Sequence, residues 1–151
     1  TAVLLNGDEA AVAKLLMDPN AIVSLSDAGA HTTFFNDAGF GLHLLGYWSR
    51  DKGLMSLERA VQKLTSEQAR LFGIRDRGTL RVGAHADLLL FDPQAEWTVD
   101  PERFHTQGRN TPFAGWTLKG RVLATMLEGR FTHVADGVAF ERPAAITESA
   151  R

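Results

Sequence analysis

Two ionisable side chains stand close together near the start of the sequence, just after a short apolar run. Residues 22–26 (IVSLS) are followed at once by Asp27, and His31 comes four residues later in the stretch SDAGAH. Because parallel sheets and barrels carry their active sites at the carboxyl ends of strands, Asp27 is a candidate metal ligand or general base. It is also a candidate turn cap, a common role for aspartate. Asp-x-x-x-His is not itself a metal-binding spacing, and a single loop histidine is more often exposed or hydrogen-bonded than catalytic.

Other catalytic patterns are missing from the sequence. It contains neither His-x-His nor His-Glu-x-x-His, so no self-contained zinc site is visible. It contains no glycine-rich phosphate loop and no Gly-x-Ser-x-Gly elbow. Cysteine is absent, which excludes disulfides and thiolate metal sites. Phe34, Phe35 and Phe40 either line a pocket for an apolar substrate group or belong to the core.

The composition limits the partners. Sixteen basic and eighteen acidic residues give a net charge of −2, so no single-sign field attracts nucleic acid or an anionic membrane surface. No apolar run is long enough to span a membrane, and no signal-peptide pattern is present. We therefore expect a cytoplasmic protein with neither nucleic acid nor membrane as a partner.

The first half of the sequence predicts alternating helix and strand. Asp8 is a candidate N-cap for a helix that ends at Asp18-Pro19, residues 22–26 have the pattern of a buried strand, and 41–50 that of a buried helix. The clearest helix follows Ser56, a natural N-cap. Its apolar positions keep i, i+3, i+4, i+7 spacing and are Leu57, Ala60, Val61 and Leu64.

Glycines and prolines mark the ends of the remaining elements. Ser66 opens a second short helix, and Gly73 is placed to end it as the C′ residue. Residues 86–91 predict a strand that Asp92-Pro93 stops. Glu128-Gly129 predicts a hairpin turn between 121–127 and 130–134. The chain is thus α/β followed by β-rich, and the change of character lies near residue 76.

An ordered series of motifs carries a family resemblance. SDAGAH, followed by DAGFGLHLLGYWSRDKGLMSLERAVQKLTSEQARLFGIRDRGTLRVGAHADLLLFDP, resembles the C-terminal third of metal-dependent amidohydrolases. The branch that it resembles most is that of the N-acyl-D-amino-acid deacylases (D-aminoacylases). The later stretch GRNTPFAGWTLKGRVLATMLEGRF is similar to the tail of dihydroorotases and hydantoinases. We therefore expect this chain to be part of something longer.

The resemblance implies a (β/α)8 barrel with a small β-sandwich built from both ends of the chain. Residues 1–76 would be the C-terminal segment of the barrel, with its last strand at 22–26 and closing helices at 41–72. Residues 77–134 would be the C-terminal part of the sandwich, or composite, domain. We expect 135–151 to be a tail that is in part disordered.

The resemblance also implies chemistry. Asp27 matches the aspartate that contacts the metal, zinc, and acts as general base, activating the attacking water and protonating the leaving amine. His31 matches the histidine of a Ser-Asp-x-x-x-His motif whose implied role is to shape the site or to contact substrate. The other ligands of the family match nothing in this sequence, so the isolated chain is expected to be inactive and not to retain zinc.

These observations favour the C-terminal portion of an amidohydrolase that hydrolyses non-peptide C–N bonds, with an N-acyl-D-amino acid or a related amide as its small-molecule substrate. Two alternatives stay open: a cyclic-amide hydrolase of the dihydroorotase or hydantoinase kind, and a non-catalytic module that oligomerises or docks on a partner. Because half a sandwich leaves unpaired edges, we expect a homo-oligomer or association with the missing barrel portion.

Overall fold

The structure is a computed structural model that describes residues 7–24 and 39–140. The chain divides into two compact units, Thr1–His85 and Ala86–Arg151. The segment limits at 76 and 134, which the family resemblance suggests, stay predictions.

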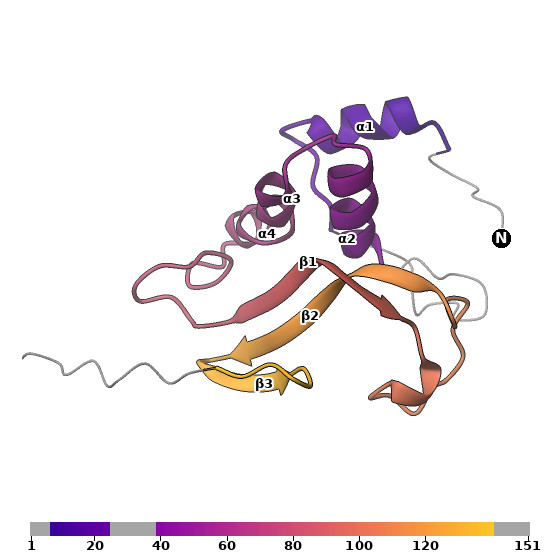
Figure 1. The fold of residues 1–151 in the computed structure, drawn as a ribbon. Coiled ribbons are helices and arrows are strands. Elements are labelled where there is room, and N and C mark those ends of the chain that lie inside the picture. Colours follow the sequence, from indigo (N-terminus) through magenta and orange to yellow (C-terminus); the bar gives the residue numbers. More distant parts are fainter. Residues whose placement is uncertain (1–6, 25–38, 141–151) are drawn as a thin grey trace, which may run out of the picture. The chain divides into compact units, whose positions relative to one another are not determined.

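The first unit is helical over its described residues. Its elements are the helices α1 (Glu9–Met17), α2 (Phe40–His43), η1 (Leu44–Asp51), α3 (Leu57–Leu64) and α4 (Ser66–Leu71) (Figure 1). Two predicted N-caps are confirmed. Asp8 Oδ1 accepts hydrogen bonds from two backbone N–H groups of α1, at 2.9 and 3.2 Å, and Ser56 Oγ accepts one from the Arg59 N–H at 3.3 Å.

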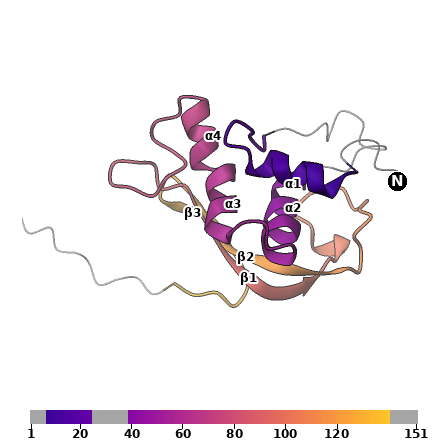
Figure 2. The same ribbon diagram turned by 90° about the horizontal axis from the view of Figure 1, so that it is seen from above.

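Helix ends were also predicted correctly where glycine or proline marks them. Helix α1 ends at Met17 with Asp18 as its C-cap. Helix α4 ends at Leu71, and Gly73 follows with φ of 70°, the left-handed conformation that glycine adopts without strain. Helix α4 follows α3 end to end, and only Thr65 separates the two helices (Figure 2).

The helix predicted at 41–50 is present but is not uniformly α. It begins as α2 and continues as the π-helix η1, in which the Lys52 N–H bonds the carbonyl of Tyr47, five residues back, at 2.8 Å. Leu44 and Trp48 are buried, as expected. They form the core of the unit together with Met55 and Ala60, and residues of α1 and of the segment before Asp27 pack against this cluster.

The described part of the predicted strand 22–26 is not a strand. Residues 21–24 lie outside any helix or strand, and residues 25 and 26 lie outside the described ranges. A strand exists only where a neighbour pairs with its backbone. Here the carbonyl groups of Ala21 and Val23 accept hydrogen bonds from side chains instead, those of Lys63 and Gln68.

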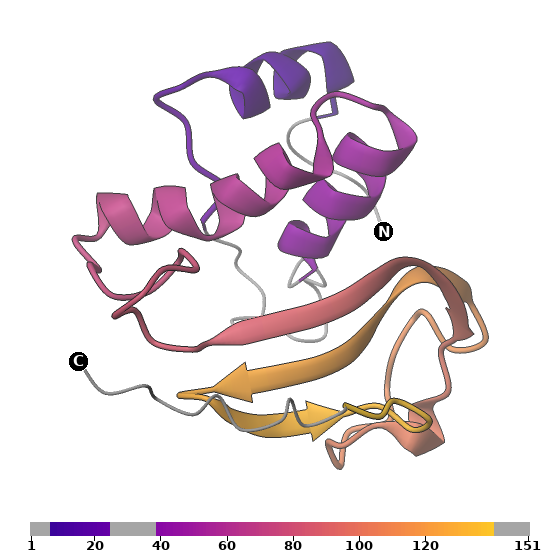
Figure 3. The same ribbon diagram turned by 60° about the vertical axis from the view of Figure 1, so that its left-hand side comes forward.

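The second unit contains a sheet of three antiparallel strands in its described residues, in the order β1-β2-β3 (Figure 3). The strands are β1 (Leu88–Thr98), β2 (Thr117–Leu127) and β3 (Arg130–Val134), and a 3₁₀-helix, η2, spans Pro101–Arg103. The predicted hairpin is confirmed, because β2 and β3 are joined by Glu128 and Gly129. Both have the positive φ, 50° and 76°, that a two-residue turn requires.

The prediction that Asp92-Pro93 stops the strand is wrong, because β1 continues to Thr98. The register shows why proline is tolerated there. Asp92 pairs with Arg121 and Glu96 pairs with Lys119, so the residues between them form a bulge without ladder partners. Asp92 Oδ1 accepts hydrogen bonds from two N–H groups of that bulge, at 2.8 and 3.2 Å.

The segment after β3 is described as far as residue 140. The Ala135 N–H donates to the Leu123 carbonyl at 2.8 Å, and the Phe140 ring stacks on Phe131 with 4.8 Å between centroids. The remaining positions of the predicted tail lie outside the described residues. Across 7–24 and 39–140, no helix has the length and apolar character needed to cross a membrane.

Candidate functional site

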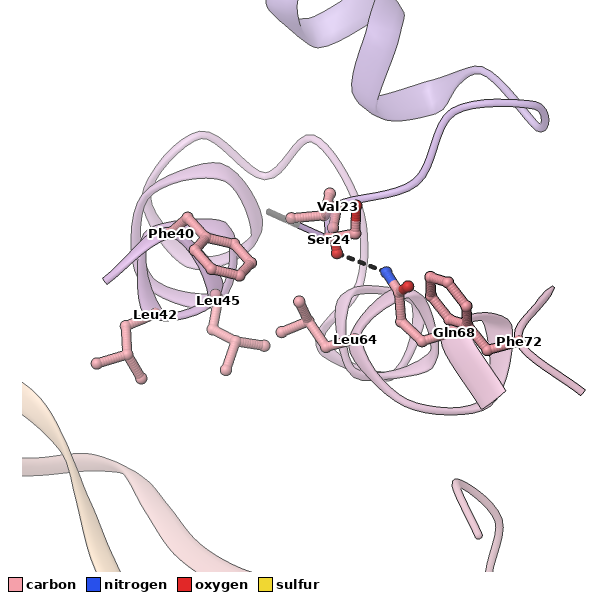
Figure 4. A pocket seen from close by; sticks show the side chains of 9 residues that line it. Val23, Ser24, Phe40, Leu42, Leu45, Leu64, Gln68 and Phe72 are labelled. Carbon is pink, nitrogen blue, oxygen red and sulfur yellow. Dashed lines mark hydrogen bonds between the residues drawn. The ribbon is translucent and has the colours of Figure 1, made fainter. Parts of the chain in front are cut away.

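The first unit contains a pocket of about 620 Å³ beside the segment that leads to Asp27. Figure 4 shows Phe40, Leu42 and Leu45 on one side of it, and Leu64, Gln68 and Phe72 on the other (Figure 4). Val23 and Ser24 close a third side, and Gly41 completes the lining. Most of these side chains are apolar, and the two polar ones are those of Ser24 and Gln68.

Gln68 is held in one orientation by two carbonyl groups. Its Nε2 donates to the Val23 carbonyl at 2.5 Å and to the Lys63 carbonyl at 3.3 Å. Both neighbours are acceptors, so the amide must present its NH₂ group and not its oxygen to them. The side chain therefore ties the segment 21–24 to helix α4 and to the end of α3.

Lys63 is the most buried charged residue described, with 1% of its surface exposed. Burial of an ammonium group costs free energy unless polar partners surround it. Its Nζ donates to the Ala21 carbonyl at 3.3 Å and lies 3.8 Å from a Glu67 carboxylate oxygen. The group also lies in the last turn of α3, where helix carbonyls favour a cation.

A second cation, Arg59, holds the Glu67 carboxylate from the other side. Arg59 Nη1 donates to Glu67 Oε1 and to Gln62 Oε1. This hydrogen bond lowers the pKa of Glu67 below its ordinary value of 4.5, although partial burial acts in the opposite direction. Glu67 is therefore a stable anion that balances the buried Lys63.

This arrangement corrects the predicted apolar face of α3. Val61 is 36% exposed, whereas Ala60 and Lys63 are buried completely or nearly so. The buried face thus centres on residues three apart, one of them charged. The sequence signal that could have found Lys63 is its spacing, i+3 from Ala60 and i−4 from Glu67.

The predicted site residues Asp27 and His31 lie outside the described residues, and so do Phe34 and Phe35. Phe40 lines the pocket described above, and its predicted contact with an apolar substrate group stays a prediction. The roles of Asp27 and His31 therefore stay predictions. The structure describes the chain up to Ser24, three residues before Asp27.

The histidines of the described residues do not form a metal site. His43 stacks on Tyr47 with 4.8 Å between ring centroids, and His85 Nε2 lies 3.2 Å from Asp76 Oδ2. His105 and His133 meet edge to face at 5.9 Å. Within 7–24 and 39–140, no group of three His, Asp or Glu side chains is placed to hold a metal ion. The described side chains therefore offer no set of ligands for the metal that the family resemblance implies, and the predicted ligand Asp27 lies outside them.

Comparison with known proteins identifies the family. Residues 10–133 match the model of the amidohydrolase family. The chain belongs to the amidohydrolase family. Among its curated relatives, the dihydroorotase of Pelotomaculum thermopropionicum is 38% identical over 136 residues, covering 82% of this chain and 32% of that protein. The dihydroorotase of Syntrophus aciditrophicus is 44% identical over 86 residues, covering 57% of this chain and 20% of that protein.

Solved structures of hydantoinases are also similar to this chain. The amidohydrolase chain resembles an L-hydantoinase (dihydropyrimidinase) from Arthrobacter aurescens with a TM-score of 0.54 and 33% identity, over 70% of this chain and 23% of that one. It resembles a D-hydantoinase (dihydropyrimidinase) from a Thermus species with a TM-score of 0.52 and 28% identity, over 67% and 22%. The chain therefore spans about a fifth to a third of the length of these relatives.

Proposed function

We propose that this chain is the C-terminal portion of an amidohydrolase that hydrolyses the C–N bond of a cyclic amide. The observation that carries the proposal is the 38% identity to a dihydroorotase over 82% of the chain. The structural likeness to hydantoinases supports the same substrate class. All these names refer to substrates in which the amide lies in a ring. They favour the cyclic-amide alternative over the N-acyl-D-amino acid that the sequence motifs alone suggested.

In the proposed reaction Asp27 handles the proton. Water adds to the ring carbonyl carbon while the Asp27 carboxylate accepts one of its protons. The C–N bond then breaks, and Asp27 passes the same proton to the departing ring nitrogen. The product is an open chain with a carboxyl group at one end, and Asp27 regains its initial state. His31 would contact the substrate.

A metal ion, for which zinc remains our proposal, would polarise the carbonyl and acidify the water when bound. Since the described side chains contain no cluster that fits one, the proton transfers above are the only steps assigned to this chain. Small-molecule cyclic amides are the proposed partners of the active protein. Nucleic acid and membrane are not among the proposed partners, and a cytoplasmic location also stays a proposal.

A substrate panel tests the proposal. The protein that contains this chain should be assayed with dihydroorotate, hydantoin and a dihydropyrimidine, and in parallel with N-acetyl-D-amino acids. We expect kcat/KM for one of the cyclic amides to exceed that for every acylated amino acid by about 10²-fold or more, because the two substrate shapes leave different polar groups unpaired in one site. A preference for the acylated amino acids would contradict the cyclic-amide proposal and restore the deacylase interpretation.

A further inference from the structure

The segment before Asp27 is held by side chains at two points that are two residues apart. Lys63 Nζ donates to the Ala21 carbonyl at 3.3 Å, and Gln68 Nε2 donates to the Val23 carbonyl at 2.5 Å. Both donors come from the α3–α4 pair, 42 and 45 residues further along the chain. Two long-range bonds to one short segment without regular secondary structure fix its position more firmly than either bond alone.

Each donor is itself held. The Nε2 group of Gln68 also donates a hydrogen bond to the Lys63 carbonyl, at 3.3 Å. The amide therefore cannot rotate without loss of both hydrogen bonds. Lys63 is 1% exposed, and Glu67 stands 3.8 Å from its Nζ. Glu67 in turn is bonded by Arg59. The two anchors therefore belong to one connected group that spans both helices.

The anchors lie close to Asp27 along the chain. Asp27 follows Val23 by four residues, and an extended chain advances at most about 3.3–3.6 Å per residue, so their Cα atoms are within about 14 Å. Only three residues of the sequence therefore separate the anchored Val23 from Asp27, the proposed general base. A misplacement of about 1 Å at a reacting group can cost on the order of 10² in rate.

We infer that Lys63 and Gln68 are positioning residues, which act through the backbone of Ala21 and Val23 to set where Asp27 enters the active site. The inference rests on the proposed function for its effect on the rate. Its structural half, that the two side chains anchor residues 21–24, does not depend on the substrate.

The test uses two variants that remove the donors and preserve bulk, Gln68→Met and Lys63→Met, in the protein that contains this chain. Gln62→Met is the matched control, because Gln62 accepts a hydrogen bond from Arg59 but makes none to residues 21–24. Lys63→Arg is the conservative variant that retains a buried donor. Two readouts are taken at a temperature where all variants are folded: kcat and KM with the preferred cyclic amide, and hydrogen–deuterium exchange by peptide.

We expect Gln68→Met and Lys63→Met to lower kcat by about 10- to 100-fold with KM changed less than about 3-fold, since binding groups elsewhere are untouched. Exchange should rise at least several-fold in peptides that cover 21–27 and stay unchanged elsewhere. Lys63→Arg should recover most of kcat, and Gln62→Met should match the wild type in both readouts. A purely structural role would lower the unfolding temperature without this split between kcat and KM.

Normal kcat and normal exchange in folded Gln68→Met would overturn the inference, even if Lys63→Met fails to fold. The two proposals fail in different ways. If the wild-type protein turns over no cyclic amide, the proposed function is wrong, while exchange at 21–27 still decides whether the anchors exist. If the wild type is active and the variants equal it, the function stands and the positioning role is wrong.

Discussion

Lys63, Glu67 and Arg59 form a line of charges in which each side chain restricts the next. The buried ammonium lies 3.8 Å from Glu67, and the guanidinium bonds the other carboxylate oxygen. An unpartnered ammonium would be costly at 1% exposure, so the carboxylate is required for Lys63 to remain where it meets Ala21. The contact between Lys63 and the segment before Asp27 thus involves, at the level of single residues, two further charges on α3 and α4.

Stability should depend on pH through Glu67. Its pKa in the folded chain lies below 4.5, so its contribution is present above pH 4.5 and is lost as pH falls through the lower, folded value. We expect Glu67→Gln to lower the free energy of unfolding by about 1–2 kcal/mol at pH 7, because a hydrogen bond to a charged group is lost. The difference from the wild type should shrink as pH falls from 4.5 to 3.

Urea unfolding of both proteins from pH 7 to pH 3 measures this effect. Glu102→Gln is the control, since the Glu102 side chain is 83% exposed and lies 4.0 Å from Arg109. This variant should have the same free energy of unfolding as the wild type at every pH. If the difference in free energy of unfolding between Glu67→Gln and the wild type stays constant down to pH 3, the charge of Glu67 does not stabilise the unit.

At the level of elements, the turn after α4 is shaped by two glycines in the left-handed conformation. Gly78 has φ of 82°, and Gly83 has φ of 85°. A Cβ at Gly78 would lie 2.8 Å from the Ala69 Cβ and 3.1 Å from the Thr65 carbonyl oxygen, whereas a Cβ at Gly83 would meet nothing within 4 Å. The turn therefore packs closely on α4 at one glycine only.

Substitution by alanine should lower the free energy of unfolding by different amounts at Gly78 and Gly83. Gly83→Ala should lower the free energy of unfolding by about 1–2 kcal/mol, the strain of a left-handed alanine. Gly78→Ala should cost about 1–3 kcal/mol more, because backbone or Ala69 must move to admit the methyl group. Thermal or urea unfolding of the two variants gives both numbers, and equal costs would mean that Gly78 is not closely packed.

The elements that could be predicted from the sequence are those whose ends are set by local chemistry. Ser56 caps α3, and Glu128 and Gly129 form the turn between β2 and β3, because cap and turn geometry depend on neighbouring residues alone. The continuation of β1 past Pro93 could not be predicted, since it depends on a bulge whose flanking residues pair with Arg121 and Lys119, far along the chain.

The candidate site shows the same division. Asp27 could be proposed from the sequence, because an aspartate after an apolar run is a candidate catalytic residue and because it lies in the family motif. Lys63 was missed, because a lysine on a helix is usually exposed, and only tertiary contacts with Ala21 and Glu67 make its burial tolerable. Long-range contacts of this kind leave only weak spacing signals in a single sequence.

At the level of the whole molecule, the sheet of the second unit exposes apolar side chains on consecutive residues. Leu88, Leu89 and Leu90 of β1 are 41, 58 and 47% exposed. Successive strand residues point to opposite faces, so both faces of this strand carry exposed leucine. We propose that these faces are covered by further protein, in a longer amidohydrolase or in a second copy of the chain.

The 151-residue chain purified alone is therefore expected to self-associate, with a mass that rises with concentration in light scattering. Leu89→Lys should reduce this association, because it places a charge on the exposed sheet. Leu71→Lys is the matched control, since Leu71 is also 58% exposed but lies at the end of α4. Association that is lost equally in both variants, or a chain that stays monomeric at every concentration, would contradict this assignment of the sheet.

The most direct measurement of the central claim is the turnover of Asp27→Asn in the protein that contains this chain, with the cyclic amide that the wild type prefers. We expect kcat to fall by about 10²–10⁴-fold at an unchanged unfolding temperature, because the amide cannot accept and return the proton. Asp51→Asn, a change at an exposed aspartate that pairs with Arg50, should retain normal turnover. Near-normal turnover in folded Asp27→Asn would contradict the claim that this chain supplies the proton-transfer group of a cyclic-amide hydrolase.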